Sequence, residues 1–251
     1  MFCQIRLSEG HQQNLFQTAH SMKIGFVILC RYNSSRLPGK ILKEIQGKTI
    51  LQYIIDSLSV ITNQKNIVVA TSVEQTDDLI VEYCNKNNIQ VFRGDLNNVS
   101  KRFMECANSF GFDYVTRING DNIFVDQSTI QEMLVVAKTG KYDFISNVKN
   151  RTFPKGMSVE IVHTKYYNEV YQSFESEDDF EHVTINLYQN DEGKNYFYFY
   201  NEKCKEAAGL QFAIDTQEDF VNAQRIIKKL NKNNHFTIEE IYRTFEEINE
   251  E

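Results

Sequence analysis

The pattern of apolar and polar positions in the first half of the chain alternates between two kinds of segment. Short, nearly continuous apolar runs are typical of buried strands, whereas apolar residues spaced three and four apart indicate amphipathic helices. The predicted strands are 24–30, 66–71, 89–92 and 113–118. The predicted helices are 49–60 with Thr49 as N-cap, 77–87 with Asp77 and Asp78 in its first turn, and 97–110. This order predicts an α/β fold, with a mainly parallel sheet that carries helices on both faces.

The second half of the chain is less regular. Its predicted strands are 143–146, 158–162 and 195–200, and its predicted helices are 178–190 and 216–230. We expect a single domain over 22–251, with a small inserted arm or hairpin at about 147–200 whose exposed aromatic strands serve dimerisation. Residues 1–21 are polar, and we expect them to form a poorly ordered extension.

Composition narrows the classes of function. The 251 residues are 41% hydrophobic and carry a net charge of −7, which argues against nonspecific nucleic-acid binding. Five cysteines without C-x-x-C spacing indicate reduced thiols in a cytoplasmic protein. No apolar stretch is long enough to span a bilayer, so we expect no membrane partner. An acidic protein that binds a polyphosphate must gather its cations locally.

The loop at 31–40, with sequence R-Y-N-S-S-R-L-P-G-K, gathers such cations directly after the first predicted strand. Loops at the carboxyl ends of parallel strands form the ligand crevice of open α/β sheets, and arginine and lysine suit phosphate oxygens. The candidate phosphate ligands are Arg31, Ser34, Ser35, Arg36 and Lys40. Composition alone equally allows an ordinary charged surface loop.

Two further loops place carboxylates after apolar runs. R-I-N-G-D-N ends the fourth predicted strand and offers Asp121 to a cation, although a turn with a local side-chain hydrogen bond explains the same residues. The stretch F-A-I-D-T-Q-E-D at 212–219 offers Asp215. There Thr216 and Asp219 also fit a variant of the capping box. Two distant carboxylates that converge are a normal way to hold Mg²⁺ against phosphates.

Taken in order, these motifs resemble the cytidylyltransferases that activate sugar acids. The resemblance is to the spore-coat polysaccharide type of acylneuraminate cytidylyltransferase and to the CMP-Kdo synthetases, and it runs from about residue 22 to 230. It implies a Rossmann-like nucleotide-diphospho-sugar transferase fold, CTP as donor, and Mg²⁺ held by Asp121 and Asp215. It also implies that Arg31, Arg36 and Lys40 hold the triphosphate.

Three weaker motifs extend the resemblance. V-F-R-G at 91–94 and a following arginine imply that Arg93 and Arg102 contribute to the nucleotide pocket, although Lys101 replaces a family aspartate. Ala70 and Thr71 are expected beside the base. F-P-K-G-M-S-V-E at 153–160 and E-H-V-T at 181–184 resemble acceptor-side motifs, with Ser158 in place of the usual aspartate. The expected acceptor-binding residues are Asn122, Lys155, Glu160, Glu181 and His182. A hairpin turn and a packed helix face are the structural alternatives for these two stretches.

The resemblance implies transfer of CMP from CTP to a sugar acid or related small anionic acceptor, with release of pyrophosphate, in surface polysaccharide biosynthesis. We expect a homodimer, as in many relatives. Four alternatives stay open: another NTP as donor, a phosphorylated or non-sugar acceptor, a glycosyltransferase, and a catalytically silent relative.

Overall fold

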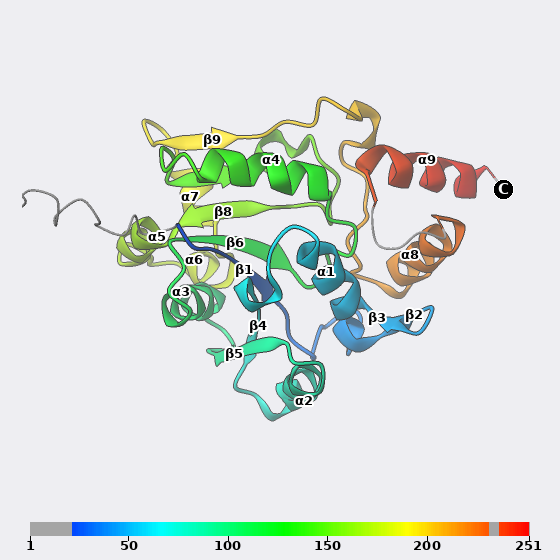
Figure 1. Ribbon diagram of the computed structural model, residues 1–251, viewed down its shortest axis with the longest axis horizontal. Helices are drawn as coiled ribbons and strands as arrows, with labels where there is room; N and C mark the ends of the chain where they lie inside the picture. Colours follow the sequence, from blue (N-terminus) through cyan, green and yellow to red (C-terminus); the bar gives the residue numbers. More distant parts are fainter. Residues whose placement is uncertain (1–21, 231–235, 251) are drawn as a thin grey trace, which may run out of the picture.

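The computed structural model of the protein describes residues 22–230 and 236–250, so the expected extension at 1–21 lies outside the described residues. The first strand, β1 (Ile24–Leu29), is buried along its whole length. It lies within a seven-stranded sheet with the order β5-β4-β1-β6-β8-β7-β9 (Figure 1). The other strands are β4 (Ile67–Ser72), β5 (Gln90–Gly94), β6 (Tyr114–Asn119), β7 (Phe144–Ser146), β8 (Glu160–His163) and β9 (Tyr196–Tyr198).

The sheet is mainly parallel. Strands β5, β4, β1 and β6 pair in parallel, β8 runs antiparallel to both β6 and β7, and β7 pairs in parallel with β9. The predicted class of fold is therefore confirmed. A separate short hairpin, β2 (Glu44–Ile45) and β3 (Lys48–Thr49), follows the first loop and leads into α1 (Ile50–Ser59). Thr49 caps that helix as predicted, because its hydroxyl accepts a hydrogen bond from Gln52 N.

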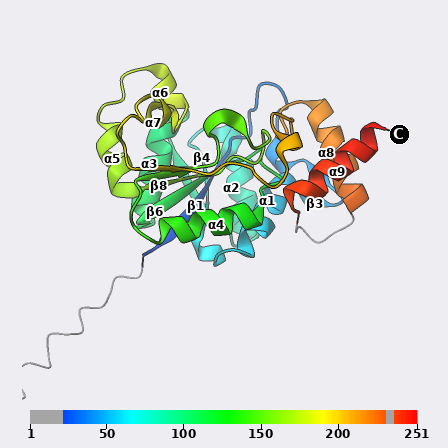
Figure 2. The same cartoon turned by 90° about the horizontal axis from the view of Figure 1, so that it is seen from above.

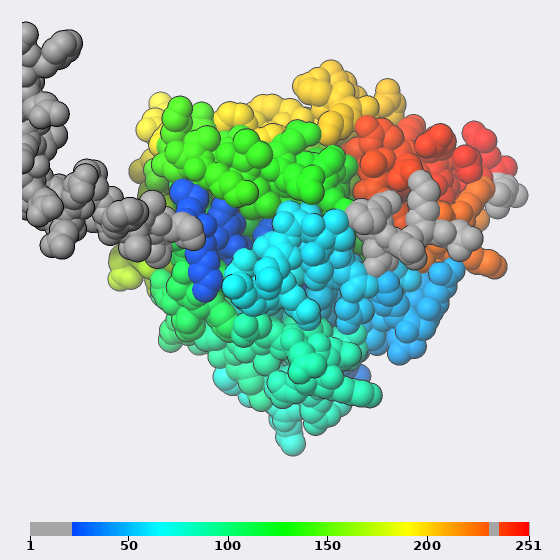
Figure 3. All heavy atoms as spheres, viewed as in Figure 1, coloured from blue at the N-terminus to red at the C-terminus, as the bar shows by residue number. Residues whose placement is uncertain are grey.

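Successive residues of β1 belong in turn to two hydrophobic cores, one on each face of the sheet. Phe26 and Ile28 pack with α1, α2 (Asp78–Lys86) and α4 (Gln127–Ala137). Side chains of these helices cover most of the sheet on that face (Figure 3). Val27 and Leu29 pack in the opposite core with α3 (Val99–Ser109), α5 (Thr164–Tyr171) and α7 (Ile185–Gln189). Helices α3, α5 and α7 gather with α6 (Glu177–Glu181) on that second face (Figure 2).

The last two helices extend the first core at one end of the molecule. Helix α8 (Gln217–Leu230) and helix α9 (Ile238–Asn249) lie side by side, and α9 begins at a capping box formed by Thr237 and Glu240 (Figures 1 and 2). Among the described residues, no helix combines the length and apolar character needed to cross a bilayer.

The segment 147–200, where we expected an arm or hairpin, contributes β8 and β9 to the central sheet and three helices to its second face. The single helix predicted at 178–190 is two helices, α6 and α7. The chain turns between them because Val183 is buried and its carbonyl accepts a hydrogen bond from the Tyr167 hydroxyl at 2.7 Å. The role of the aromatic strand β9 in dimerisation stays a prediction.

Candidate functional site

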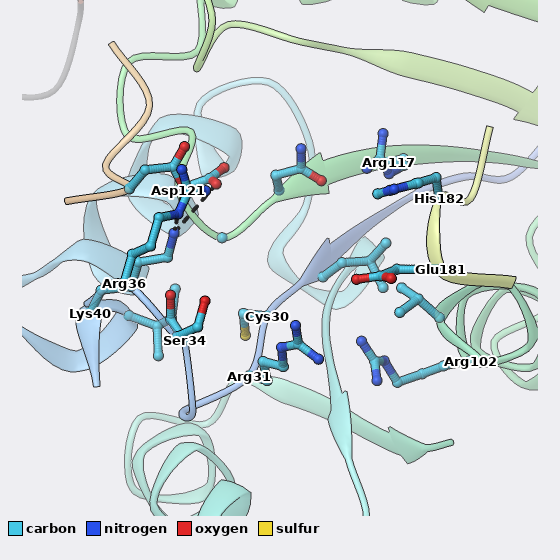
Figure 4. A pocket seen from close by; sticks show the side chains of 17 residues that line it. Cys30, Arg31, Ser34, Arg36, Lys40, Arg102, Arg117, Asp121, Glu181 and His182 are labelled. Carbon is cyan, nitrogen blue, oxygen red and sulfur yellow. Dashed lines mark hydrogen bonds and ion pairs between the residues drawn. The ribbon is translucent and has the colours of Figure 1, made fainter. Parts of the chain in front are cut away.

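A cleft of about 320 Å³ opens where the loops after β1 and β6 meet at the carboxyl end of the sheet. Figure 4 shows charged side chains on both sides of it, with Lys40, Arg36 and Asp121 at one end and Arg102, Glu181 and His182 at the other. Its polar lining is Arg31, Ser34, Ser35, Arg36, Lys40, Arg102, Arg117, Asn119, Asp121, Glu181, His182 and Asp215. Ten of these twelve residues were predicted from the sequence, and Arg117 and Asn119 are the additions.

A buried carboxylate anchors the loop after β1 through a hydrogen bond to its backbone. Asp77 is 1% exposed and accepts a hydrogen bond from Tyr32 N at 2.7 Å. The carbonyl of Tyr32 in turn accepts hydrogen bonds from Ser34 N at 3.0 Å and from Gly39 N at 2.8 Å, which closes the loop on itself. Gly39 adopts φ 69°, a left-handed conformation that glycine reaches without steric cost. These contacts position Arg36 and Lys40 at the cleft.

Two cations and two carboxylates meet at one end of the cleft. Lys40 Nζ lies 3.2 Å from Asp215 Oδ1 and 3.5 Å from Asp121 Oδ2, and it donates to the carbonyl of Ile214 at 2.8 Å. Arg36 Nη2 lies 2.9 Å from Asp215 Oδ1. Burial raises the pKa of Asp121, an effect that Lys40 opposes and Asp215 reinforces. The structure therefore brings together Asp121 and Asp215, which lie 94 positions apart in the sequence.

Close backbone approaches bring the two carboxylates together. A Cβ at Gly120 would lie 2.6 Å from Cys30 Cβ, so only glycine lets the chain before Asp121 pass so near β1. Ile214 N donates to the carbonyl of Asp121 at 3.1 Å, which ties the two acidic segments directly. Gly156, at φ 94°, faces the same segment, and a Cβ there would lie 2.3 Å from Ala213 N.

The donor set of this acidic pair fits a hard cation. Asp121 Oδ1 is buried and accepts no hydrogen bond from any described residue, so one carboxylate oxygen is available to a ligand. Oxygen ligands from one or two carboxylates, completed by phosphate oxygens, are what Mg²⁺ prefers. The described residues contain no group of three or more His, Cys, Asp or Glu side chains able to hold a metal alone. Any cation at Asp121 and Asp215 would therefore need ligands beyond these side-chain types, such as phosphate oxygens of the substrate and water.

Arg31 and Arg102 supply positive charge at the other end. Arg102 is 2% exposed, and its Nη1 donates to the carbonyl of Asp95 at 2.6 Å. Its Nε is buried and has no hydrogen-bond partner among the described residues. Burial lowers the pKa of Arg102. A neighbouring cavity of about 550 Å³, which shares Arg31 and Glu181 with the cleft, continues past this point along Asp95, Asn97 and Phe180.

Three residues predicted for the nucleotide pocket lie outside the cleft lining. Ala70 is fully buried in the second core. Thr71 is also fully buried, and its hydroxyl donates to Asp77 at 2.8 Å, so it supports the first loop from beneath. Arg93 donates to the carbonyls of Ser72 and Glu74 and pairs with Asp78 on the surface. These contacts assign Thr71 and Arg93 to the scaffold below the cleft.

Of the predicted acceptor residues, Glu181 and His182 line the cleft, whereas Asn122 and Lys155 do not. Asn122 is 1% exposed, and its amide donates to the carbonyl of Ser158 at 3.0 Å. Lys155 has an exposed side chain, and its backbone bonds to Leu210 and Phe212. It thereby joins the 153–160 stretch to the segment that carries Asp215.

Glu160, the fifth predicted acceptor residue, lies in a side chamber of about 240 Å³ that opens off the cleft. It is 2% exposed and pairs with Arg117. It also accepts hydrogen bonds from the hydroxyls of Thr184 at 2.7 Å and Tyr188 at 2.6 Å. Burial opposes ionisation of Glu160, but Arg117 and these hydroxyls outweigh it and lower the pKa.

The additions to the predicted site carry a weak signal in the sequence. Arg117 and Asn119 stand in the R-I-N-G-D stretch that supplied Asp121. Because side chains alternate along a strand, Arg117 and Asn119 of β6 point to one side of it, and Asp121 lies in the turn that follows. Their place at the end of the strand that leads to Asp121 could have indicated both for the cleft.

Comparison with known proteins gives consistent similarities. A family model described as cytidylyltransferase matches residues 26–249. The chain is 28% identical over 217 residues to the spore coat polysaccharide biosynthesis protein SpsF of Bacillus subtilis, covering 81% of this chain and 86% of that protein. It is 30% identical over 149 residues to 3-deoxy-manno-octulosonate cytidylyltransferase 2 of Hydrogenovibrio crunogenus, covering 57% of this chain and 58% of that protein. The solved structure of a cytidylyltransferase from Leptospira borgpetersenii matches with a TM-score of 0.84 at 28% identity, covering 91% of this chain and 96% of that one.

Proposed function

The chain belongs to the cytidylyltransferase family and is a nucleotidyltransferase, and we propose that it transfers CMP from CTP to a sugar acid or a related anionic acceptor with release of pyrophosphate. The observation that carries this proposal is the convergence of Arg36 and Lys40 with Asp121 and Asp215 at the carboxyl end of the sheet. The names of the relatives, which refer to spore coat polysaccharide and to 3-deoxy-manno-octulosonate, support a sugar acid as acceptor.

In the proposed reaction an acceptor oxygen attacks the α-phosphorus of CTP. A new phosphorus–oxygen bond forms, the bond from the α-phosphorus to the bridging oxygen breaks, and pyrophosphate leaves as the acceptor proton passes to water. Such a transfer is catalysed mainly by positioning and by charge stabilisation. Arg36 and Lys40 reach the triphosphate from the first loop, and Arg31 adds a further cation to the same cleft.

Asp121 and Asp215 would hold Mg²⁺ in this proposal. When bound, the cation would neutralise the charge that develops on the phosphate oxygens during the transfer. The two carboxylates also orient Lys40, which contacts both of them and the carbonyl of Ile214. In the free protein these three contacts hold the Lys40 ammonium group in place. When the nucleotide binds, its phosphate oxygens compete with them for Lys40. We further propose that the enzyme acts in the cytoplasm as a homodimer in surface polysaccharide biosynthesis.

The test is pyrophosphate release by the purified protein with CTP, UTP, ATP or GTP, with and without Mg²⁺, over a panel of sugar acids. We expect turnover that is selective for CTP and dependent on Mg²⁺. Asp121→Ala and Asp215→Ala should each lower kcat by at least about 100-fold, a loss comparable to that of one strong electrostatic contact in a transition state. Glu44→Ala, which removes an exposed carboxylate outside the cleft, is the matched control.

The outcomes separate the alternatives. Turnover with another nucleotide would change the assigned donor but not the class of reaction. Turnover with a phosphorylated or non-sugar compound would change the assigned acceptor. Near-normal turnover in both aspartate variants would refute the assignment of the acidic pair. If the unmodified protein releases no pyrophosphate and shows no thermal shift with any of the four nucleotides, the catalytically silent relative is favoured.

A further inference from the structure

The cleft and the neighbouring cavity of about 550 Å³ meet at a junction formed by three shared residues, Arg31, Val99 and Glu181. Arg36 and Lys40 lie at the opposite end of the cleft (Figure 4). A nucleotide whose phosphates contact these two cations would extend its nucleoside toward the junction. Because the ribose connects the phosphates to the base, a base in the neighbouring cavity would leave the ribose at the junction.

Glu181 brings to this junction a carboxylate that no described residue neutralises. Its side chain has no ion pair or hydrogen bond within 22–230 and 236–250. The cleft cations Lys40 and Arg36 pair with Asp215, and Arg117 pairs with a different glutamate. Phosphate oxygens only accept hydrogen bonds from a protein, so a free carboxylate repels them. A ligand group that gains from contact with Glu181 must therefore donate hydrogen bonds.

The backbone on both sides of Glu181 is anchored. Two residues earlier, the carbonyl of Asp179 accepts a hydrogen bond at 2.6 Å from the hydroxyl of Ser100, a fully buried residue of α3. Two residues later, the carbonyl of the buried Val183 accepts one from the Tyr167 hydroxyl at 2.7 Å. These contacts fix the end of α6 against α3 and α5. Glu181 is thus presented by a preorganised segment, which lowers the cost of binding a ligand.

Glu181 and the next residue, His182, face different neighbours of the cleft. His182 lines the cleft and the side chamber of Glu160, whereas Glu181 lines the cleft and the neighbouring cavity. Arg102 lies at the same end of the cleft as Glu181 (Figure 4). It is 2% exposed, and its Nε has no partner among the described residues. A buried donor without a partner indicates a missing acceptor, so a polar ligand fits this end of the cleft.

We propose that Glu181 accepts hydrogen bonds from the ribose hydroxyls of the donor nucleotide and so selects ribonucleotides over deoxyribonucleotides. An ionised carboxylate has two acceptor oxygens, and a ribose presents its 2′ and 3′ hydroxyls as neighbouring donors. An acidic residue binds ribose hydroxyls in the same way in dinucleotide-binding folds. This inference rests on the proposed function, because it takes the ligand of the cleft to be a nucleotide. It assigns Glu181 to the donor, whereas its sequence motif suggested the acceptor.

The test is isothermal titration calorimetry of CTP, 2′-deoxy-CTP and 3′-deoxy-CTP with the purified protein in Mg²⁺ and without acceptor. We expect at least one deoxy analogue to bind at least about ten-fold more weakly than CTP, because Glu181 loses a donor. Glu181→Ala should bind all three nucleotides alike, at the affinity of the weaker analogue. Glu181→Gln keeps one acceptor oxygen and should fall between. Because Glu181 is exposed, neither variant should lower Tm.

Asp178→Ala is the matched control, because Asp178 is an exposed carboxylate of the same helix and lines neither the cleft nor the neighbouring cavity. It should keep the full preference for CTP. Equal binding of the three nucleotides by the unmodified protein, or an undiminished preference in Glu181→Ala, would overturn the inference and leave the proposed function intact.

The two proposals can also fail in the opposite order. If UTP, ATP or GTP binds in place of CTP, the titrations are repeated with the deoxy forms of that nucleotide. A preference for the ribonucleotide that disappears in Glu181→Ala would then support the inference while the proposed donor fails. If the unmodified protein binds none of the four nucleotides, both proposals are overturned.

Discussion

The buried carboxylate of Asp77 allows a direct test of how the cleft is built. Its Oδ1 accepts a hydrogen bond from Tyr32 N, and its Oδ2 accepts three, from Thr71 Oγ1, Ser72 N and Ser72 Oγ. Asp77→Asn keeps the shape of the side chain but turns one acceptor oxygen into a donor. Whichever way the amide is oriented, one of the two backbone N–H groups then faces a donor.

The expected loss in the free energy of unfolding follows from these contacts. A hydrogen bond to a charged group contributes about 1.5–3 kcal/mol, and a buried donor left without a partner costs about 1–3 kcal/mol. We therefore expect Asp77→Asn to lower the free energy of unfolding by about 3 kcal/mol. For a chain of this size that loss corresponds to a fall in Tm of about 6–12 °C. Because Tyr32 anchors the first loop, KM for the nucleotide should also rise.

The same carboxylate predicts a dependence of stability on pH. Burial tends to raise the pKa of Asp77, but the hydrogen bonds from Ser72, Tyr32 and Thr71 outweigh it and lower the pKa below its usual 3.8. A carboxyl whose pKa is lower in the folded state contributes stability above its unfolded pKa and loses it as pH falls through the folded value. The difference in Tm between the unmodified protein and Asp77→Asn should therefore shrink below about pH 4.

The assay is thermal and urea denaturation of both proteins, with Asp78→Asn as the control. Asp78 is the next residue, its side chain is 45% exposed, and it pairs with Arg93 at 2.6 Å. An exposed ion pair contributes about 1 kcal/mol or less, so the control should lose little stability. Equal losses in the two variants, or a loss of under about 1 kcal/mol for Asp77→Asn, would refute the reasoning.

Two further predictions concern the walls of the site. Glu160→Gln breaks a buried ion pair and should lower the free energy of unfolding by about 3–5 kcal/mol in urea denaturation, whereas Glu132→Gln at an exposed pair should change it little. If the urea midpoint of Glu160→Gln equals that of the unmodified protein, the contacts described for Glu160 in the side chamber are contradicted. Gly156→Ala adds a Cβ at φ 94° against the backbone of Ala213, so both Tm and kcat should fall; Gly193→Ala, at φ 67° in open space, should lower Tm alone.

The sequence was sufficient to predict the parts of the site that are continuous in the chain. The apolar run before 31–40 places the cationic loop at the end of a buried strand, and the acidic stretches at 121 and 215 follow apolar runs in the same way. The meeting of the cationic loop with Asp121 follows from sheet topology, because the carboxyl ends of the parallel strands β1 and β6 share one edge. Asp215 follows no strand of the described sheet, and the hydrogen bond from Ile214 N to the Asp121 carbonyl brings it to the same place. The four predicted strands of the first half confirm this reasoning.

Contacts between distant side chains could not be predicted in this way. The sequence indicates Asp77 as a residue of a first helical turn, yet its carboxylate serves Tyr32, which lies 45 positions earlier. The same limit applies to Thr71, whose small buried hydroxyl has a partner that no local pattern reveals. Glu160 matched an acceptor motif, but its pairing with Arg117 depends on the register of β6 and β8.

Lys40 links the binding of two ligands through competition for its ammonium group. In the free protein this group compensates the charge of both Asp121 and Asp215. A polyphosphate that draws Lys40 away removes this compensation and leaves Asp215 with Arg36 alone, and a divalent cation at the carboxylates releases Lys40. Each ligand should therefore raise the affinity of the other by the same factor, as thermodynamic reciprocity requires. A titration with either ligand alone would underestimate an affinity that only the ternary complex displays.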